Sequence, residues 1–284
     1  MTLAALLAEG VALLDRAGIP GAEIDARLLL QQVTGYSRSG LMLHGSETAA
    51  RETVARYRRL LARRADREPV QYILGEQEFW SLDFVVSPSV LIPRPETEFV
   101  LEQALAACTG GGVVRALDLG TGSGVIAVVL ARELGCRVTA VDLSPAALMV
   151  AARNLARHGV AGRVHLVCGD LFAPLVPVAR YDLLVSNPPY IVEAEIDRLE
   201  PEVSRAEPRL ALDGGVDGLA CIRRIAAAAH CYVRPGGWVF LEIGADQRET
   251  AARLFPVSLY DAVGVIDDWA GRPRVVRARV RPSP

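Results

Sequence analysis

Strand-like and helix-like patterns alternate along the middle of this 284-residue chain, and this alternation limits the fold more than any other feature. Short apolar runs typical of buried strands are separated by segments with helical spacing, and Ser144 before Pro145 is a typical helix start. Repeated strand, helix, strand units predict a parallel sheet covered on both faces. We therefore expect a doubly wound α/β fold with strands at 113–119, 137–143, 164–167, 181–186, 237–243, 257–263 and 275–280.

The residues before this region follow a different pattern. Apolar side chains recur at helical spacing in 2–17, 22–33 and 46–67, which predicts a small helical bundle. From Glu78 to Val86 the period changes to two, which predicts a short hairpin, and prolines stiffen the chain after it. We expect a helical domain at 1–75, a hairpin linker at 76–95 and an α/β domain at 96–284.

Composition narrows the chemistry. All 31 basic residues are arginine, which excludes lysine chemistry such as a Schiff base or a phosphate-loop lysine. A net charge of -2 does not indicate nucleic-acid or membrane binding. The cysteines and histidines lack metal-ligand spacing, and no uninterrupted apolar run of about 18 residues occurs. We expect a cytoplasmic protein that binds no metal and no membrane.

A glycine-rich loop, DLGTGSG at 118–124, follows the first predicted strand of the sheet. Glycines allow a tight turn and a close approach of the backbone to a ligand, and the next helix start offers free N–H groups. The loop also fits the G-x-G-x-x-G/A fingerprint of dinucleotide-binding proteins. Asp142 would hold ribose hydroxyls in a dinucleotide-binding protein and equally in a protein that binds another nucleoside-containing cofactor. From the loop alone, a nicotinamide oxidoreductase remains a rival hypothesis.

The run Asn187-Pro188-Pro189-Tyr190 directly follows the predicted strand at 181–186. Two prolines end the strand, because they have no N–H for a sheet ladder. The corner then presents the Asn187 side-chain oxygen and the Pro188 carbonyl as fixed acceptors beside an aromatic ring. This combination suits a planar NH2 group as ligand, and the alternative is an ordinary strand-to-loop turn.

Together these motifs resemble those of the seven-stranded class I S-adenosylmethionine-dependent methyltransferases. The loop at 118–124, Asp142, Gly169-Asp170-Leu171 and NPPY occur in the expected order, and NPPY is typical of enzymes that methylate a planar nitrogen. LIPRPETE at 91–98, EPRLALDGG at 207–215 and the helical N-terminal domain further resemble the PrmC/HemK family. That family methylates N5 of the glutamine in the GGQ motif of peptide chain release factors.

The resemblance implies roles for individual residues. Asn187 and Pro188 would be catalytic, and Asn187, Pro188, Pro189, Tyr190, Thr97 and Glu98 would contact the substrate glutamine. S-adenosyl-L-methionine, which becomes S-adenosyl-L-homocysteine, would be the cofactor, with no metal. Its binding residues would be Asp118, Gly120, Thr121, Gly122, Ser123, Gly124, Asp142, Asp170, Leu171 and Asn187.

Several alternatives stay open at this point. If the resemblance holds, the partner would be a release factor, bound by the helical domain of a monomeric enzyme, and no stable nucleic-acid binding is expected. The alternative is an adenine-N6 methyltransferase that acts on nucleic acid. Such an enzyme would need a larger phosphate-binding surface. The arginine-rich segment Arg51–Arg67 is either a solvated face or a docking surface. Glu193, Glu195 and Glu200 either help to close a loop over the substrate or form an acidic surface.

Overall fold

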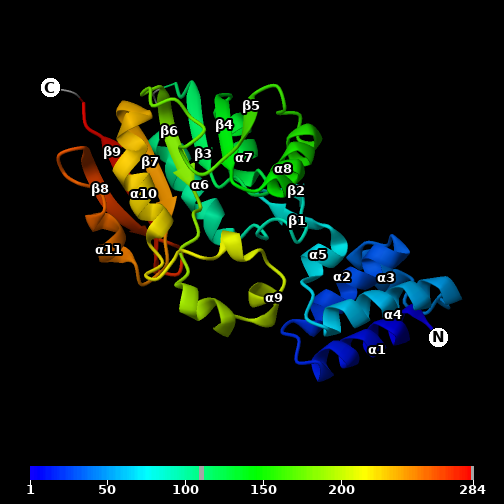
Figure 1. Ribbon diagram of the computed structural model, residues 1–284. Helices are drawn as coiled ribbons and strands as arrows, with labels where there is room; N and C mark the ends of the chain where they lie inside the picture. Colours follow the sequence, from blue (N-terminus) through cyan, green and yellow to red (C-terminus); the bar gives the residue numbers. More distant parts are fainter. Residues whose placement is uncertain (109–111, 283–284) are drawn as a thin grey trace. The chain divides into compact units, whose positions relative to one another are not determined.

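The structure, a computed structural model, describes residues 1–108 and 112–282 (Figure 1). Its contacts divide the chain into two units. The first contains Met1–Glu76 and Glu200–Ala206, and the second contains Gln77–Leu199 and Glu207–Pro284. The first unit therefore includes a segment from the middle of the sequence. None of the helices in the described ranges is long and apolar enough to cross a membrane.

The first unit is helical. Its helices are α1 (Leu3–Arg16), α2 (Ala22–Thr34), α3 (Arg38–Leu43), α4 (Arg51–Ala65), α5 (Val70–Leu74) and α9 (Pro201–Ser204). Thr2 caps α1, because its Oγ1 accepts a hydrogen bond from the Ala5 backbone N–H at 3.2 Å. Leucines of α1, α2 and α4 pack around the buried ring of Tyr57, and Gly10 leaves room for its hydroxyl.

The predicted helix at 46–67 is too long by several residues, because α4 begins only at Arg51. The helices α3 and α5 were not predicted, since each is shorter than two turns and shows too little periodicity.

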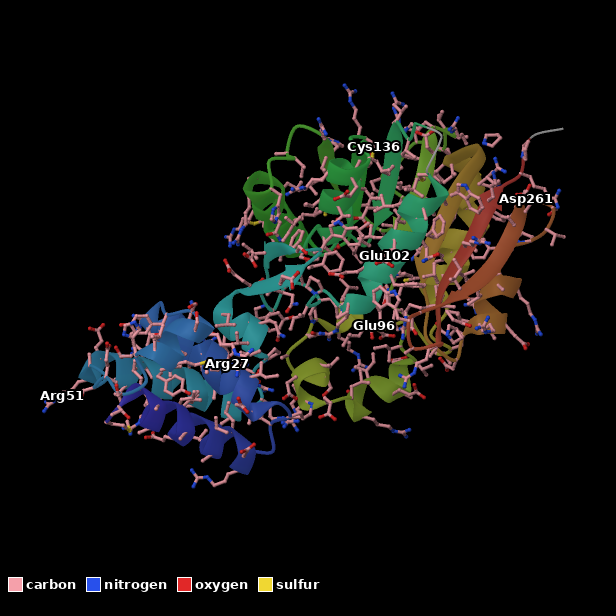
Figure 2. The ribbon with its side chains drawn as sticks, turned by 180° about the vertical axis from the view of Figure 1, so that it is seen from behind. Arg27, Arg51, Glu96, Glu102, Cys136 and Asp261 are labelled. Atoms are coloured by element: carbon pink, nitrogen blue, oxygen red, sulfur yellow. The ribbon has the colours of Figure 1, made fainter. Side chains whose placement is uncertain are left out.

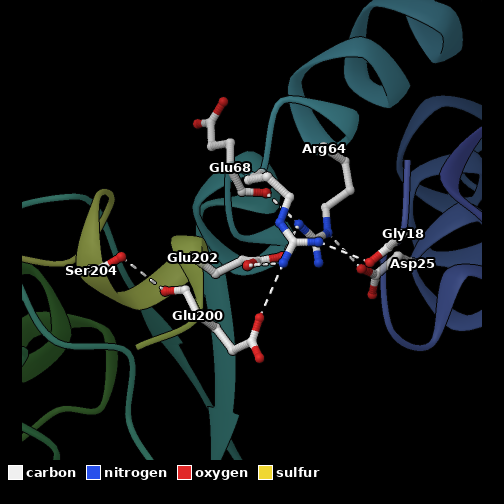
Figure 3. A network of polar contacts seen from close by, with 8 residues as sticks. Gly18, Asp25, Arg64, Glu68, Glu200, Glu202 and Ser204 are labelled. Carbon is white, nitrogen blue, oxygen red and sulfur yellow. Dashed lines mark hydrogen bonds and ion pairs between the residues drawn. The ribbon is translucent and has the colours of Figure 1, made fainter. Parts of the chain in front are cut away.

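A network of ion pairs joins α9 to α2 and α4 within the first unit (Figure 3). The buried Arg64 donates to Asp25 Oδ2 at 2.7 Å and to Glu202 Oε1 at 2.8 Å. Arg67 donates to Glu200 Oε2 at 3.1 Å, and it lies 3.1 Å from Glu202 Oε2 as an ion pair without hydrogen-bond geometry. Arginines of the segment Arg51–Arg67 therefore hold a distant part of the chain, a role beyond the two predicted for it.

The second unit begins with the hairpin of β1 (Glu76–Phe79) and β2 (Leu82–Val85), except that Glu76, the first residue of β1, belongs to the first unit. The second unit is built on one seven-stranded sheet with the order β5-β4-β3-β6-β7-β9-β8, which confirms the predicted fold. The strands are β3 (Arg115–Leu119), β4 (Arg137–Asp142), β5 (Val164–Cys168), β6 (Tyr181–Ser186), β7 (Val233–Glu242), β8 (Tyr260–Asp267) and β9 (Pro273–Val280).

Helices cover both faces of this sheet (Figure 1). On one face lie α6 (Pro95–Ala107), α7 (Val125–Glu133) and α8 (Pro145–Arg157), and on the other lie α10 (Ala220–Ala228) and α11 (Arg248–Arg253). Neighbouring strand residues alternate between the two cores: Ala116 packs under the first set of helices and Leu117 under the second. The buried strands hold their carboxyl ends in one row, where ligands bind in such folds.

Two details of the predicted fold were wrong. The sheet is not wholly parallel, because β9 pairs antiparallel with both β7 and β8. The sequence predicts a long polar loop at 191–217, but this segment contains η1 (Glu193–Arg198), α9 and η2 (Arg209–Ala211), while η3 (Ala229–Cys231) extends α10. An apolar run predicts a buried strand but not its direction.

Candidate active site

A cavity opens at the carboxyl ends of β3, β4 and β6. It is lined by Leu91, Pro93, Thr97, Gly120, Thr121, Gly122, Ser123, Asp142, Gly169, Asp170, Leu171, Asn187, Pro189, Pro208 and Leu210, among others. Parts of every sequence motif therefore meet in one place, including the two segments LIPRPETE and EPRLALDGG that were far apart in the chain.

Asp142 braces the glycine loop. Its Oδ2 accepts from the Gly122 backbone N–H and its Oδ1 from the Ser144 N–H, each at 2.8 Å. Burial raises the pKa of Asp142, and these backbone donors oppose the rise. Gly122 itself has a φ of 54°, in the left-handed region that glycine adopts without strain. The carboxylate thus fixes the loop while further lone pairs of its oxygens stay available for hydroxyl groups.

Asp118 lies behind the loop and does not line the cavity. It is fully buried, and its Oδ2 accepts from the Thr121 hydroxyl at 2.6 Å. Oδ1 has no hydrogen-bond partner among the residues that the structure describes. Burial raises the pKa of Asp118 to about 7, although the hydroxyl of Thr121 and the backbone N–H of Ala127 counteract this rise. Gly124 is also behind the loop, where its missing side chain lets α7 approach Ala151 of α8.

Asp170 and Leu171 border the cavity after β5. The Asp170 carboxylate accepts from Arg224 of α10 at 2.8 Å, which fixes its position while leaving it half-exposed. Leu171 has a φ of 48°, which costs a leucine free energy and often marks a functional segment. The strained backbone holds an apolar side chain at the cavity wall.

A chain of hydrogen bonds runs from Asn187 away from the cavity. Asn187 Nδ2 donates to Thr97 Oγ1 at 3.0 Å, and the Thr97 hydroxyl donates to Glu242 Oε2 at 2.7 Å. On the other side of the same carboxylate, the Tyr190 hydroxyl donates to Oε1 at 3.0 Å. Glu242 ends β7 and is completely buried, and burial raises its pKa against the opposing effect of the two hydroxyls and Arg274.

The corner after Asn187 is fixed from several sides. Pro188 is buried, and Pro189 lines the cavity. The Gln247 side chain donates to the Tyr190 carbonyl at 2.9 Å, and Ser186 Oγ donates to the Leu119 carbonyl at 2.6 Å, which ties β6 to β3. The NPPY corner is therefore rigid before any ligand arrives.

Glu98, the neighbour of Thr97, faces elsewhere. Its Oε1 accepts from the Trp80 backbone N–H at 2.6 Å, and it lines a second hollow beside the hairpin. Arg94 of the same motif donates to both oxygens of the buried Glu207, each at 2.8 Å. This ion pair fastens EPRLALDGG to LIPRPETE. The structure thus brings Thr97 to Asn187 but not Glu98.

Comparisons with known proteins identify similar chains and domains. Residues 5–75 match the PrmC N-terminal domain, and residues 97–216 match the methyltransferase small domain. The release factor glutamine methyltransferase of Geobacter sulfurreducens is 47% identical over 264 residues, which are 93% of this chain and 91% of that protein. The protein of the same name from Cereibacter sphaeroides is 46% identical and is covered over 99% of both chains.

The chain belongs to the release factor glutamine methyltransferase family. Solved structures agree on the fold. A methyltransferase from Pyrococcus furiosus superposes with a TM-score of 0.54 at 22% identity, over 72% of this chain and 91% of that one. The catalytic domain of hMettl16 gives a TM-score of 0.57 at 17% identity, over 78% of this chain and 81% of that one.

Two side chains of this family member were missed by sequence reasoning. Glu242 and Gln247 hold Tyr190 and the segment around it, yet Glu242 was treated only as the end of an apolar strand. An acidic residue at the carboxyl end of a buried strand is the same signal that pointed to Asp118 and Asp142. No local signal pointed to Gln247.

Proposed function

We propose that this chain transfers a methyl group from S-adenosyl-L-methionine to the side-chain N5 of the glutamine in the GGQ motif of release factors. The orientation of Asn187 carries the proposal, because its Nδ2 is engaged by Thr97 and its Oδ1 is left as an acceptor at the cavity. The names of the relatives support this substrate. The enzyme would accordingly act in the cytoplasm, as a monomer and without a metal.

The residues present fit this cofactor. The unpaired Oδ1 of Asp118 is a buried acceptor behind the glycine loop, which suits a nearby ammonium group directly or through water. Asp142 would accept from ribose hydroxyls, and Asp170 and Leu171 would contact the adenine edge and face. Gly120, Thr121, Gly122 and Ser123 would surround the methionine part, with Gly124 shaping the turn. The bound cofactor supplies an electrophilic methyl group.

The substrate side of the site would raise the reactivity of an amide nitrogen. The lone pair of an amide is delocalised into its carbonyl, so it is a weak nucleophile. Asn187 Oδ1 and the Pro188 carbonyl would accept the two N–H bonds of the glutamine, which stabilises positive charge as it develops on nitrogen. Pro189 and Tyr190 would pack against the side chain and hold it in place, with the fixed corner supplying the orientation.

Asn187→Ala tests the assignment. We expect methyl transfer to a release factor to fall by about 10²-fold or more, because a preorganised acceptor is lost. S-adenosylmethionine affinity, measured by calorimetry, should change only a few-fold. Equal turnover by the variant contradicts the role of Asn187. Incubation with labelled cofactor and either release factor or DNA tests the substrate, and label in DNA alone refutes it.

The helical domain at 1–75 is proposed to bind the release factor. Arg51, Arg56 and Arg59 of α4 are exposed and have no ion pair with any described residue, so they remain available to an acidic surface. Replacing Arg56 and Arg59 together with glutamine should raise KM for the release factor several-fold and leave kcat unchanged. An unchanged KM contradicts this placement of the partner.

A further inference from the structure

Glu242 stands outside the cavity but is joined to it by hydrogen bonds. It does not line the cavity, and among the described residues its hydrogen-bonded link to Asn187 runs through the Thr97 hydroxyl, which is itself buried. We propose that Glu242 is a positioning residue that determines which end of the Asn187 amide faces the substrate. This inference rests on the proposed function, because it concerns how the site distinguishes a carboxamide.

The direction of each hydrogen bond follows from what each group can do. A carboxylate only accepts, whereas a hydroxyl donates one hydrogen and also accepts. Glu242 therefore takes the single Thr97 hydrogen, with the two oxygens 2.7 Å apart. The Thr97 oxygen is then left as an acceptor, and it receives a hydrogen from Asn187 Nδ2 at 3.0 Å. The amide oxygen is consequently the end of Asn187 that remains for a ligand.

The surroundings of Glu242 favour one fixed arrangement. Its second oxygen accepts from Tyr190, so both oxygens have a hydroxyl donor. The charged groups that face it are Glu96 of α6, which raises its pKa, and Arg274 of β9, which lowers it. No other charged group of the described chain is among the causes of its shift. A proton or an amide in place of one oxygen would let Thr97 accept instead of donate.

That reversal has a chemical consequence. If Thr97 turned its hydrogen toward Asn187, the Asn187 oxygen would face Thr97 and its NH2 would face the substrate. A donor would then meet the NH2 of the substrate glutamine, and the site would suit a glutamate better. Substrate choice between glutamine and glutamate therefore depends on an acidic residue that never touches either one.

Binding without turnover tests this directly. The wild-type chain should bind a release factor more tightly than its GGQ-to-GGE variant, measured by calorimetry with S-adenosyl-L-homocysteine present. Glu242→Gln should reduce this preference at least about fivefold, and Thr97→Val should do the same. Thr97→Ser, which keeps the hydroxyl, should retain the wild-type preference for the GGQ release factor. Glu102→Gln is the matched control, since Glu102 is an exposed acid on the helix that carries Thr97 (Figure 2).

Turnover gives a second, independent readout. Glu242→Gln and Thr97→Val should each lower kcat about tenfold or more, and the double variant should be no worse than either single one, because both break the same chain. The wild-type kcat should fall as the pH is lowered and Glu242 takes up a proton, and Glu242→Gln should lack this fall.

Two results overturn the inference. Additive losses in the double variant would show separate structural roles, and an unchanged glutamine preference in Glu242→Gln would remove its basis. A wild-type chain that methylates no release factor would instead refute the proposed function, and this inference with it.

Discussion

Each unit contains a buried carboxylate within a polar network, but the partners of that carboxylate differ. In the first unit, Asp25 and Glu202 meet the guanidinium of Arg64 (Figure 3). In the second unit, Glu242 meets the hydroxyls of Thr97 and Tyr190. A charge is therefore matched by a charge in one network and by neutral donors in the other.

The difference teaches what each kind of network can do. Guanidinium groups only donate and carboxylates only accept, so an ion-pair network fixes positions and ends there. A hydroxyl both donates and accepts, so it passes an orientation on to the next group. The first network can attach α9 to its neighbours, whereas the second can align a distant amide. Four predictions test this contrast.

Arg64→Ala should break the charge-matched network with the largest effect. It removes the guanidinium partner of Asp25 and leaves Glu202 with Arg67 as its remaining ion-pair partner, and losing one member of a buried ion pair costs about 3–5 kcal/mol of unfolding free energy. Hydrogen exchange should increase in α2, α4 and 200–206. Unfolding of the second unit, followed by the fluorescence of Trp80, Trp238 and Trp269, should stay unchanged. The control is Arg59→Ala on the same helix, and equal effects of the two variants would contradict the role of Arg64.

Arg94→Ala should sharpen the contrast, because it removes a charge partner inside the second unit. Glu207 is buried, and its burial raises its pKa while Arg94 lowers it. Because Arg94 is one-third exposed, solvent weakens the ion pair, and we expect the free energy of unfolding to fall by about 1–3 kcal/mol. A urea titration followed by tryptophan fluorescence measures this fall. The control is Arg132→Ala, since Arg132 is exposed, and it should change the free energy of unfolding by less than about 0.5 kcal/mol. A similar loss in both would show that the ion pair is not the cause.

Asp118 lies between the two cases, since one of its oxygens accepts from a hydroxyl and the other has no hydrogen-bond partner in the described part of the chain. Its pKa is about 7, so it carries a proton below that pH, and only the ionised form attracts a cationic ammonium group. S-adenosylmethionine affinity should therefore rise with pH between about 5 and 7, by at most about tenfold per pH unit. Calorimetry measures this rise, and Asp118→Asn should show a flat dependence. A rise that persists in the variant would assign it to another group.

Glu98→Gln should have the smallest effect. Its carbonyl oxygen can still accept from the Trp80 N–H, so we expect a stability change below about 1 kcal/mol. Methyl transfer should stay within about twofold of wild type, whereas the neighbouring Thr97→Val should lower it much further. A large loss of activity in Glu98→Gln would support the substrate contact that the sequence predicts for this residue.

Local patterns were enough to predict much of the fold and the site. The glycine loop, Asp142 and NPPY are contiguous signals, and their positions at strand ends follow from the strand and helix alternation. Arg64 and Glu242 were not predicted as network members. Arg64 belongs to an arginine-rich segment whose composition is typical of an exposed surface. It is buried beside Asp25 and Glu202, which lie 39 and 138 positions away in the sequence. Pairings across such separations leave no local trace.

The membership of residues 200–206 in the first unit affects any exchange of parts with a relative. A chimaera that joins the first 76 residues of one homologue to the remainder of another would combine an Arg64 and a Glu202 that evolved apart. A well-matched hybrid must transplant both stretches together, although more than a hundred residues of sequence separate them.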